Sequence, residues 1–225
     1  MSFITIAGNI GAGKTTMTRL LSERFGWRPH FEAVSENPYL SDFYSDMHRY
    51  SFNIQVFFLN HRFRAHQAIV QGGHSAIQDR SIYEDAHIFA RNLYEQGKME
   101  TRDYHNYLAL YKTLCSFLEP PDLMIYLKKS LPVLKERIAE RGRDFEKNIP
   151  DEYLADLNRY YEEWMADYSV GKKLIIDTDD LDFLHNADHF EWICQKIVDQ
   201  LDQRDLFLTP KPLRPGMQQQ ILPTA

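Results

Sequence analysis

The sequence is short of the features that mark secreted, disulfide-linked or membrane-spanning proteins. It holds two cysteines in 225 residues, Cys115 and Cys194, and their separation fits no disulfide framework, redox motif or zinc site. No apolar run approaches the roughly 20 residues that a transmembrane helix requires. The first residues lack the basic stretch and long apolar core of a signal peptide. We therefore expect a cytoplasmic protein that has buried, unpaired thiols and does not associate with membranes.

Positive charge is also scarce. Asp and Glu outnumber Lys and Arg by 32 to 26, the net charge is −6, and no block of basic residues occurs. Because nucleic acid polymers bind to clusters of cations, this balance argues against such a polymer as the main partner. The nine histidines show no metal-ligand spacing, so we interpret them as structural. These absences leave a small phosphate compound as a fitting ligand.

What the sequence does contain, at its start, is a phosphate-binding loop. An apolar run over residues 2–7 leads into GNIGAGKT, residues 8–15, which matches G-x-x-x-x-G-K-[ST] between a predicted strand and a predicted helix. Backbone N–H groups of such a loop and the dipole of the following helix bind phosphate. Lys14 is expected to reach the β- and γ-phosphates, and the Thr15 hydroxyl to ligate Mg²⁺. The alternative, a glycine-rich turn with a chance lysine, is disfavoured by the full spacing. The predicted nucleotide-binding residues are Gly8, Asn9, Ile10, Gly11, Ala12, Gly13, Lys14, Thr15 and Thr16.

Along the rest of the chain, short strand-like segments alternate with helical patterns. The predicted strands cover residues 2–7, 28–34, 75–78, 123–127 and 173–176. The predicted helices cover residues 15–25, two stretches within 42–70, then 82–94, 101–118, 131–140, 150–168 and 184–201. This order predicts an α/β fold with a five-stranded parallel sheet flanked by helices. We expect one domain over residues 1–208 and a proline-rich, flexible tail over residues 209–225.

Two further strand ends carry acidic candidates, and ligands of α/β proteins bind at such ends. Glu32 follows the second strand and could take a proton from an attacking hydroxyl; the alternative is a surface acid in a loop. Asp79 and Arg80 end the third strand. There Asp79 could hold Mg²⁺, and Arg80 could bind a phosphate or hold Glu32. The alternative for this pair is a surface ion pair before the helix cap at Ser81.

An arginine-rich segment follows the fourth strand. Arg137 and Arg141 are four residues apart on one helix face, and Arg143 lies just beyond Gly142. A segment of this kind can close over phosphates as a lid and stabilise the charge of the transferring group. The alternative is a helix C-terminus whose cations offset the helix dipole.

Gln55 and Arg62 lie seven residues apart, so they share one face of a helix. A glutamine amide can pair with a base edge through its donor and its acceptor, and an ion pair between Arg62 and Asp85 could lie beneath the base. Spacing alone favours the alternative, a solvated helix face. Nearby aromatic residues are interpreted mainly as core, with a few that could sandwich a base: Phe43, Tyr44, Tyr50, Phe52, Phe57, Phe58 and Phe63.

Several motifs, in this order and spacing, resemble those of the deoxyribonucleoside kinase family: GNIGAGKTT, FEAVSENPYL, YSFNIQVFFLNHRFRAH, QDRSIYEDAHIFA and ERGRDFEKNIPDEYL. The likeness spans about residues 3–183, most of the chain. It implies a P-loop kinase fold with an arginine-rich lid, ATP and Mg²⁺ as cofactors, a deoxynucleoside as the acceptor, and a homodimer.

The resemblance also implies roles by position. Glu32 matches the base that deprotonates the sugar 5′-hydroxyl, and Arg80 matches an arginine near that hydroxyl. Asp79 stands where many eukaryotic members have Glu, and either could serve the metal. Gln55 matches the residue that pairs with the nucleobase. The remaining matches are Arg62 and Asp85 beside the base edge, Tyr44 and Glu146 at the sugar 3′-hydroxyl, Arg137, Arg141 and Arg143 on the phosphates, and Asp182 and Phe183 around the donor base.

The implied activity is ATP-dependent 5′-phosphorylation of a deoxyribonucleoside for nucleotide salvage. Members restricted to pyrimidines such as thymidine tend to lack the Arg62–Asp85 pair, so we expect deoxyadenosine or deoxyguanosine first and deoxycytidine as the near alternative. Two other readings stay open at this point. One is a nucleoside monophosphate kinase of the thymidylate type, which would need extra cations for an acceptor phosphate. The other is a P-loop protein that binds nucleotide without transferring a phosphoryl group.

Overall fold

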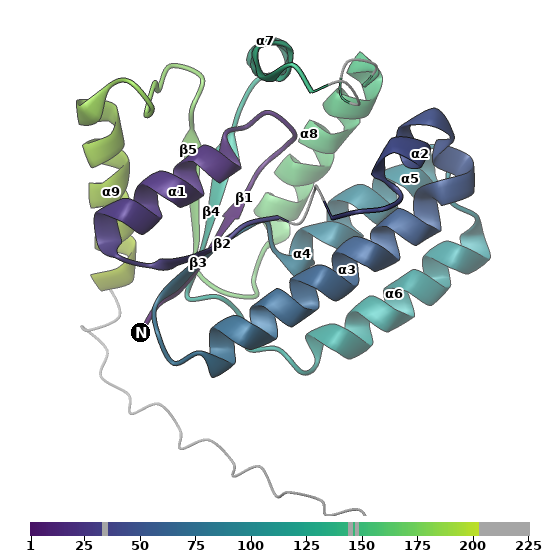
Figure 1. Ribbon diagram of the computed structural model, residues 1–225, viewed down its shortest axis with the longest axis horizontal. Helices are drawn as coiled ribbons and strands as arrows, with labels where there is room; N and C mark the ends of the chain where they lie inside the picture. The colour runs from purple at the N-terminus through teal and green to yellow at the C-terminus, as the bar shows by residue number, and fades with distance from the viewer. Residues whose placement is uncertain (33–35, 144–145, 147–148, 203–225) are drawn as a thin grey trace, which may run out of the picture.

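Five parallel strands form a sheet at the centre of the molecule (Figure 1). The computed structural model describes residues 1–32, 36–143, 146 and 149–202. The strand order is β2-β3-β1-β4-β5, and every neighbouring pair is parallel. The strands are β1 (Phe3–Ala7), β2 (Arg28–His30), β3 (Ala76–Asp79), β4 (Leu123–Lys128) and β5 (Lys173–Asp177). The predicted α/β class and five-stranded sheet are confirmed; the predicted boundary at residue 208 and the tail lie outside the described residues.

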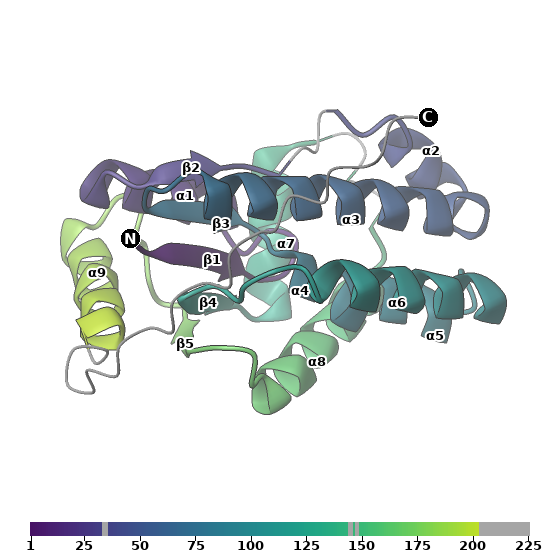
Figure 2. The same cartoon turned by 90° about the horizontal axis from the view of Figure 1, so that it is seen from below.

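Helices cover both faces of the sheet. Figure 1 shows α1 and α9 on one side and the group α3, α4, α5, α6 and α8 on the other, and Figure 2 shows α3 and α6 running alongside each other. The helical segments are α1 (Lys14–Phe25), α2 (Leu40–Ser45), α3 (Met47–Gln71), α4 (Ile82–Glu84), η1 (Asp85–Ala90), α5 (Arg91–Glu95), α6 (Thr101–Cys115), α7 (Leu131–Arg141), α8 (Asp151–Asp167) and α9 (Ala187–Asp202). In this arrangement the helices leave the carboxyl edge of the sheet available for a site.

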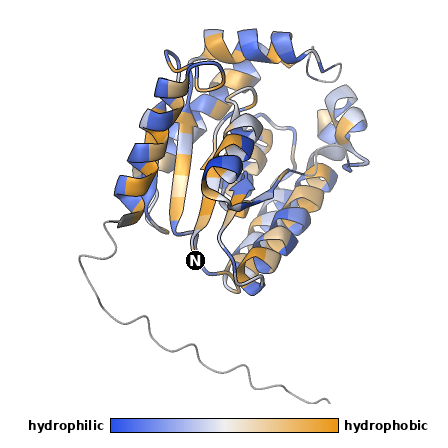
Figure 3. Ribbon diagram, turned by 60° about the vertical axis from the view of Figure 1, so that its left-hand side comes forward, coloured by the Kyte–Doolittle hydropathy of each residue, from blue (hydrophilic) through white to orange (hydrophobic). Residues whose placement is uncertain are grey.

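Strand β4 shows how the sequence builds two cores. Successive strand side chains point to opposite faces, and nearly all of this strand is buried. Leu123, Ile125 and Leu127 pack in the core beneath α1 and α9, whereas Met124 and Tyr126 pack in the core beneath α3, α6 and α8. Figure 3 shows the hydrophobic strands lying between helices whose outer faces are hydrophilic.

Several predicted element boundaries differ from the structure; the helix predicted over residues 101–118, for example, ends at Cys115. Strand β2, predicted over residues 28–34, ends at His30, which pairs with Gln78 of β3; residues 33 and 34 of that prediction lie outside the described residues. Helix α9 starts at Ala187 rather than at residue 184, since the Asp182 carboxylate accepts the backbone N–H groups of Leu184 and His185 and forms a turn. The helix predicted over residues 82–94 is interrupted by η1, a π-helical turn.

The two cysteines and the hydrophobicity of the helices bear on the expectations drawn from composition. Cys115 and Cys194 are free, the former half-buried and the latter buried, and burial raises the pKa of each thiol to about 11. None of the helices in the described part of the chain combines the length and the apolar composition needed to cross a membrane.

Candidate active site

A cavity of about 740 Å³ lies at the carboxyl edge of the sheet. Its walls come from the loop after β1, the segment after β2, the end of β3, helix α3, the π-turn η1, the lid after β4 and the loop after β5. Every predicted site residue outside Gly8 and Asn9 lines this cavity. The strand-end argument therefore located the cavity correctly.

The glycines of the P-loop are required by backbone shape and by close packing. Gly11 and Gly13 have φ values of 85° and 91°, which favour glycine. A Cβ added at Gly11 would lie 2.9 Å from the backbone oxygen of Leu134. One added at Gly13 would lie 2.9 Å from Cζ of Phe183, so the loop predicted to surround the donor base packs directly on the P-loop.

Asn9 fastens the P-loop to helix α8. Its amide nitrogen donates to the backbone oxygen of Leu154 at 3.0 Å and to Oδ1 of Asn158 at 2.6 Å. Its backbone oxygen accepts from Nζ of Lys14 at 2.8 Å. Burial and nearby Arg80 lower the pKa of Lys14 to about 7, despite the acids around it. A bound phosphate would add the negative charge that a buried ammonium needs.

Thr15 and Asp79 form the part of the site that could hold a cation. The Thr15 hydroxyl donates to Oδ2 of Asp79 at 2.6 Å, while Oδ1 of Asp79 is buried and has no hydrogen-bond partner. Burial raises the pKa of Asp79, although Lys14 opposes it. Among the described residues, no group of three or more His, Cys, Asp or Glu is arranged so that it could hold a metal ion. The donor set therefore fits Mg²⁺, which usually takes few protein ligands and completes its shell with phosphate and water.

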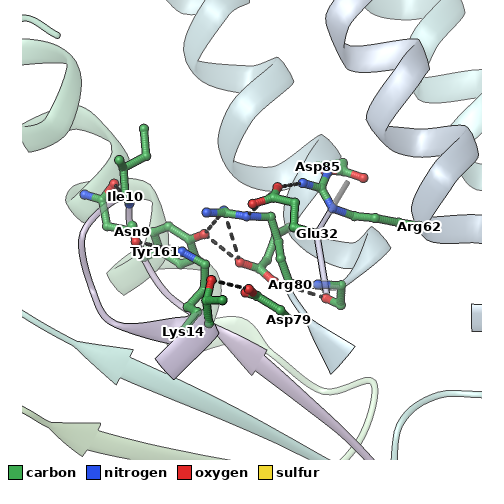
Figure 4. Close-up of polar contacts among 12 residues, drawn as sticks. Asn9, Ile10, Lys14, Glu32, Arg62, Asp79, Arg80, Asp85 and Tyr161 are labelled. Atoms are coloured by element: carbon green, nitrogen blue, oxygen red, sulfur yellow. Dashed lines mark hydrogen bonds and ion pairs between the residues drawn. The ribbon is translucent and has the colours of Figure 1, made fainter. Parts of the chain in front are cut away.

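Glu32 lies at the centre of a buried chain of charges (Figure 4). One oxygen of Glu32 accepts from Nη2 of Arg62 and lies 3.2 Å from Nε of Arg80. Arg62 also donates through Nη1 to Asp85. Burial alone would raise the pKa of Glu32, but the cations of Arg80, Arg62 and Lys14 outweigh it and lower the pKa to about 2. The surface-loop alternative for Glu32 is wrong.

Arg80 is held from several sides. Its Nη1 donates to the Tyr161 hydroxyl at 2.7 Å and lies 3.4 Å from Glu84, and its guanidinium stacks 4.4 Å from the centroid of Phe89. Glu84 also accepts the Tyr161 hydroxyl at 2.6 Å and the backbone N–H of Ser81 at 2.8 Å. Arg80 is the one non-glycine residue of the described chain with positive φ, a conformation sustained only where the surroundings enforce it.

Gln55, Arg62 and Asp85 form the far end of the cavity. Their exposed fractions are 4%, 6% and 0%, so the solvated-face alternative for α3 is wrong. The predicted Arg62–Asp85 pair is confirmed. Oε1 of Gln55 and Oδ2 of Asp85 are buried acceptors without partners. The π-turn η1 contributes both Asp85 and Phe89 to the cavity, and such turns often occur at functional sites.

The lid arginines contact acids in this structure. Arg141 binds Glu146 at 2.5 Å, and Arg143 lies 3.4 Å from the same carboxylate. Arg137 is more exposed and pairs with Glu140 at 3.0 Å. Tyr44 is half-buried near Tyr153 and Glu146, and desolvation raises the pKa of its hydroxyl. The lid and Tyr44 therefore meet at one wall of the cavity.

A model of the deoxynucleoside kinase family matches residues 4–202. The chain belongs to the deoxynucleoside kinase family. The predicted resemblance and transferase activity are thereby confirmed, and the readings as a monophosphate kinase or as a non-catalytic P-loop protein are set aside. The kinase acts on deoxynucleosides with a phosphate donor, as its family implies.

Individual relatives agree on the family and differ in the base. The kinase is 37% identical over 202 residues to the deoxyadenosine/deoxycytidine kinase of Bacillus subtilis (strain 168), covering 89% of this chain and 91% of that protein. It is 36% identical to a deoxyguanosine kinase of Lactobacillus acidophilus, covering 90% and 92%. Its fold is similar to that of the deoxyadenosine kinase from M. mycoides with bound dATP, with a TM-score of 0.78, 30% identity, and coverage of 88% and 100%.

Sequence reasoning missed several residues that line or support the kinase cavity. Lys129 and Tyr153 line it, and Tyr161 lies behind Arg80. Nζ of Lys129 donates to the backbone oxygen of Thr178 at 2.7 Å. Lys129 directly follows β4, so the strand-end rule could have identified it. Tyr153 and Tyr161 lie on the buried face of α8, where tyrosines at helical spacing are indistinguishable from core residues.

Proposed function

We propose that the kinase transfers the γ-phosphoryl group of ATP to the 5′-hydroxyl of a purine deoxynucleoside, with deoxyadenosine ahead of deoxyguanosine. The observation that carries this choice is the pair of buried, unpartnered acceptors at the base end, Oε1 of Gln55 and Oδ2 of Asp85. A buried acceptor is costly unless a donor meets it. Adenine offers its exocyclic amino group, whereas guanine and thymine carry a carbonyl at the corresponding position.

Deoxycytidine is the second candidate acceptor. Cytosine also carries an exocyclic amino group, so it too could satisfy the acceptors of Gln55 and Asp85. The Bacillus relative is named for both deoxyadenosine and deoxycytidine, which supports this pairing of substrates. Thymine has no exocyclic amino group, so its single N3–H donor could meet only one of the two acceptors.

In the proposed chemistry, Glu32 takes the proton of the 5′-hydroxyl as the sugar oxygen bonds to the γ-phosphorus. The bond from that phosphorus to the bridging oxygen breaks, and ADP leaves. Lys14 and Arg137 act on the negative charge of the transferring group, and Arg80 orients the 5′-hydroxyl and Glu32. Mg²⁺, which Thr15 and Asp79 would hold, supplies charge neutralisation on the phosphates.

The rest of the cavity is assigned to the remaining parts of the two substrates. Tyr44 and Glu146 would hold the sugar 3′-hydroxyl and so fix the orientation of the deoxyribose in the cavity. Arg141 and Arg143 would bind the phosphates, in competition with their present partner Glu146. Asp182 and Phe183 would lie beside the donor base, since Phe183 packs on the P-loop.

We also propose that the kinase is a homodimer, which the family resemblance supports. Sedimentation equilibrium of the full chain should give twice the mass of one chain. A monomer mass at micromolar concentration would contradict the dimer and leave the chemistry unaffected.

The test of the proposed function is phosphoryl transfer from Mg-ATP to a panel of acceptors: deoxyadenosine, deoxyguanosine, deoxycytidine, thymidine and their monophosphates. We expect kcat/KM to be highest with deoxyadenosine and lowest with thymidine. A panel led by thymidine would overturn the argument from the acceptors at the base end. A panel led by deoxyguanosine would keep the purine preference and overturn the order within it.

A further inference from the structure

We propose that Arg62 is a positioning residue that couples recognition of the base to proton transfer at the sugar, because it is shared between Asp85 and Glu32. On this proposal a nucleobase that engages the Asp85–Arg62 pair competes with Glu32 for the Arg62 guanidinium and frees Glu32 to act. The inference rests on the proposed roles of Glu32 and Asp85.

The first support is the geometry of one guanidinium. Nη1 of Arg62 contacts Oδ1 of Asp85, at the base end, and Nη2 contacts Oε1 of Glu32, at the sugar end (Figure 4). The side chains of Arg62, Glu32 and Asp85 are 7%, 17% and 0% exposed, so water can do little to replace a lost partner. A change in the contact between Arg62 and Asp85 should therefore change the contact between Arg62 and Glu32.

The second support is that the two arginines on Glu32 are anchored differently. Arg80 is tied to Tyr161, Glu84 and the ring of Phe89, and its backbone is fixed in a left-handed conformation. Among the described residues, the polar contacts of Arg62 are with its two carboxylates alone, and its guanidinium also lies 4.7 Å from the centroid of Phe58. Unlike Arg80, it has within the described part of the chain no hydrogen bond to a tyrosine hydroxyl and no left-handed backbone. Arg62 is therefore the partner of Glu32 that a ligand can draw away.

The third support is the effect of two cations on one carboxylate. A general base needs a pKa near the working pH, whereas the arginines and Lys14 hold that of Glu32 far below it. Loss of one guanidinium partner would make Glu32 a better proton acceptor. The same base contacts that bind the nucleoside would then accelerate the chemical step as well as the binding step.

This coupling predicts where base selectivity appears in the kinetics. A base that cannot engage Asp85 and Arg62 leaves Glu32 paired with both arginines. Its nucleoside is then turned over slowly even when it saturates the enzyme. Discrimination between deoxyadenosine and thymidine should therefore fall largely on kcat, not on KM alone.

The test divides the nucleoside into two pieces. The full-length kinase, with Mg-ATP, is given 1,2-dideoxyribose, which has the 5-hydroxyl but no base, with and without free adenine. We expect adenine to raise kcat for the sugar by about tenfold or more, because it supplies the base contacts separately. No acceleration by adenine, in an enzyme that phosphorylates deoxyadenosine, would overturn the coupling.

The variant Arg62→Gln distinguishes the proposed coupling from a purely structural role of Arg62, because the two predict opposite changes in the rate on the baseless sugar. Without its Arg62 partner, Glu32 should act on the baseless sugar faster than in the parent enzyme, and adenine should no longer accelerate the reaction. A baseless-sugar rate that falls in this variant would contradict the proposal. Arg64→Gln, two residues along the same helix and exposed, is the matched control and should behave like the parent enzyme.

A second variant guards against misfolding of Arg62→Gln. Arg62→Lys keeps the charge but has one compact donor group, which cannot bridge two carboxylates as a guanidinium does. Its melting temperature should stay close to that of the parent enzyme, and most of the acceleration by free adenine should be lost. Full acceleration by adenine in this variant would count against the coupling. Failure of the parent enzyme to phosphorylate deoxyadenosine would instead refute the proposed function.

Discussion

At the scale of single residues, the site is a buried series of alternating charges. Asp85, Arg62, Glu32, Arg80 and Glu84 follow one another, and each charged group faces at least one of opposite sign. Buried ions are tolerated only when they are paired and hydrogen-bonded. Substitution of any one of them therefore changes the protonation and placement of its neighbours as well as its own chemistry.

Glu32→Gln isolates the proton acceptor with little change in size. We expect kcat for deoxyadenosine to fall by roughly 10²-fold or more, because the amide cannot take the 5′-hydroxyl proton. Nucleoside binding should stay nearly intact, as measured by isothermal titration calorimetry. Turnover close to that of the parent enzyme would exclude Glu32 as the base.

Glu32 also makes the stability of the protein depend on pH. Its pKa is about 2 in the folded state against the usual 4.5, so its contribution is complete above pH 4.5 and is lost as the pH falls towards 2. That contribution is on the order of 3 kcal/mol in the free energy of unfolding. Urea denaturation of the parent and of Glu32→Gln should show a stability gap that narrows below pH 4.5. A gap that is constant across this window would show that Glu32 titrates normally.

At the scale of elements, the P-loop is held by helix α8 as well as by its own strand. Asn158 on α8 accepts from the Asn9 side chain at 2.6 Å and donates to the backbone oxygen of Lys129 at 2.9 Å. One side chain thus joins the loop after β1, helix α8 and the segment after β4. Two of these elements line the nucleotide end of the cavity.

Asn158→Ala should loosen this junction. We expect a loss of about 1–3 kcal/mol, since the buried amide of Asn9 loses a partner, and a melting temperature lower by several degrees. KM for ATP should rise while kcat changes less. Asn106→Ala, on the exposed face of α6, is the control and should be neutral or slightly stabilising. An unchanged KM for ATP in Asn158→Ala would exclude the junction as a support of the nucleotide site.

The secondary-structure elements were predicted from the sequence more completely than their packing. The alternation of strands and helices located the sheet, and the rule of carboxyl strand ends located the P-loop, Glu32, Asp79 and Arg80 in the cavity. Tyr44, Glu146, Asp182 and Phe183 were reached only through the family resemblance. The burial of the α3 face was not predicted. Two polar residues at helical spacing, Gln55 and Arg62, are typical of a solvent-facing helix surface, and their burial results from the packing of η1 and α6 against α3. The π-turn at Asp85 and the left-handed backbone of Arg80 were not predicted either, since tertiary contacts, not local sequence, impose them.

At the scale of the whole molecule, the cavity joins the two cores. The P-loop side belongs to the core beneath α1 and α9, and the base end to the core beneath α3 and α6. A nucleoside bound between them would contact both layers. Binding should therefore stabilise the entire fold and not only the local loops.

Thermal unfolding gives a direct measure of this effect. Deoxyadenosine at 100 times its Kd should stabilise the protein by about 2.7 kcal/mol, or roughly 5–10 °C in melting temperature for a chain of this size. Thymidine at the same concentration should give a smaller shift in differential scanning fluorimetry. A larger shift with thymidine would contradict the proposed recognition at Gln55 and Asp85.

The central place of β1 has a consequence for amide hydrogen exchange. β1 is paired on both sides, with β3 and with β4, whereas β2 and β5 are edge strands. Amides that are released only by global unfolding exchange slowest, and those at edges and lids exchange through local opening. The loop that would bind the phosphates thus follows the central strand of the sheet, whereas the predicted lid extends from α7 at the periphery. Deuterium uptake should accordingly begin in the lid and reach β1 last, so that the kinase can open to release its product while its phosphate-binding loop stays anchored.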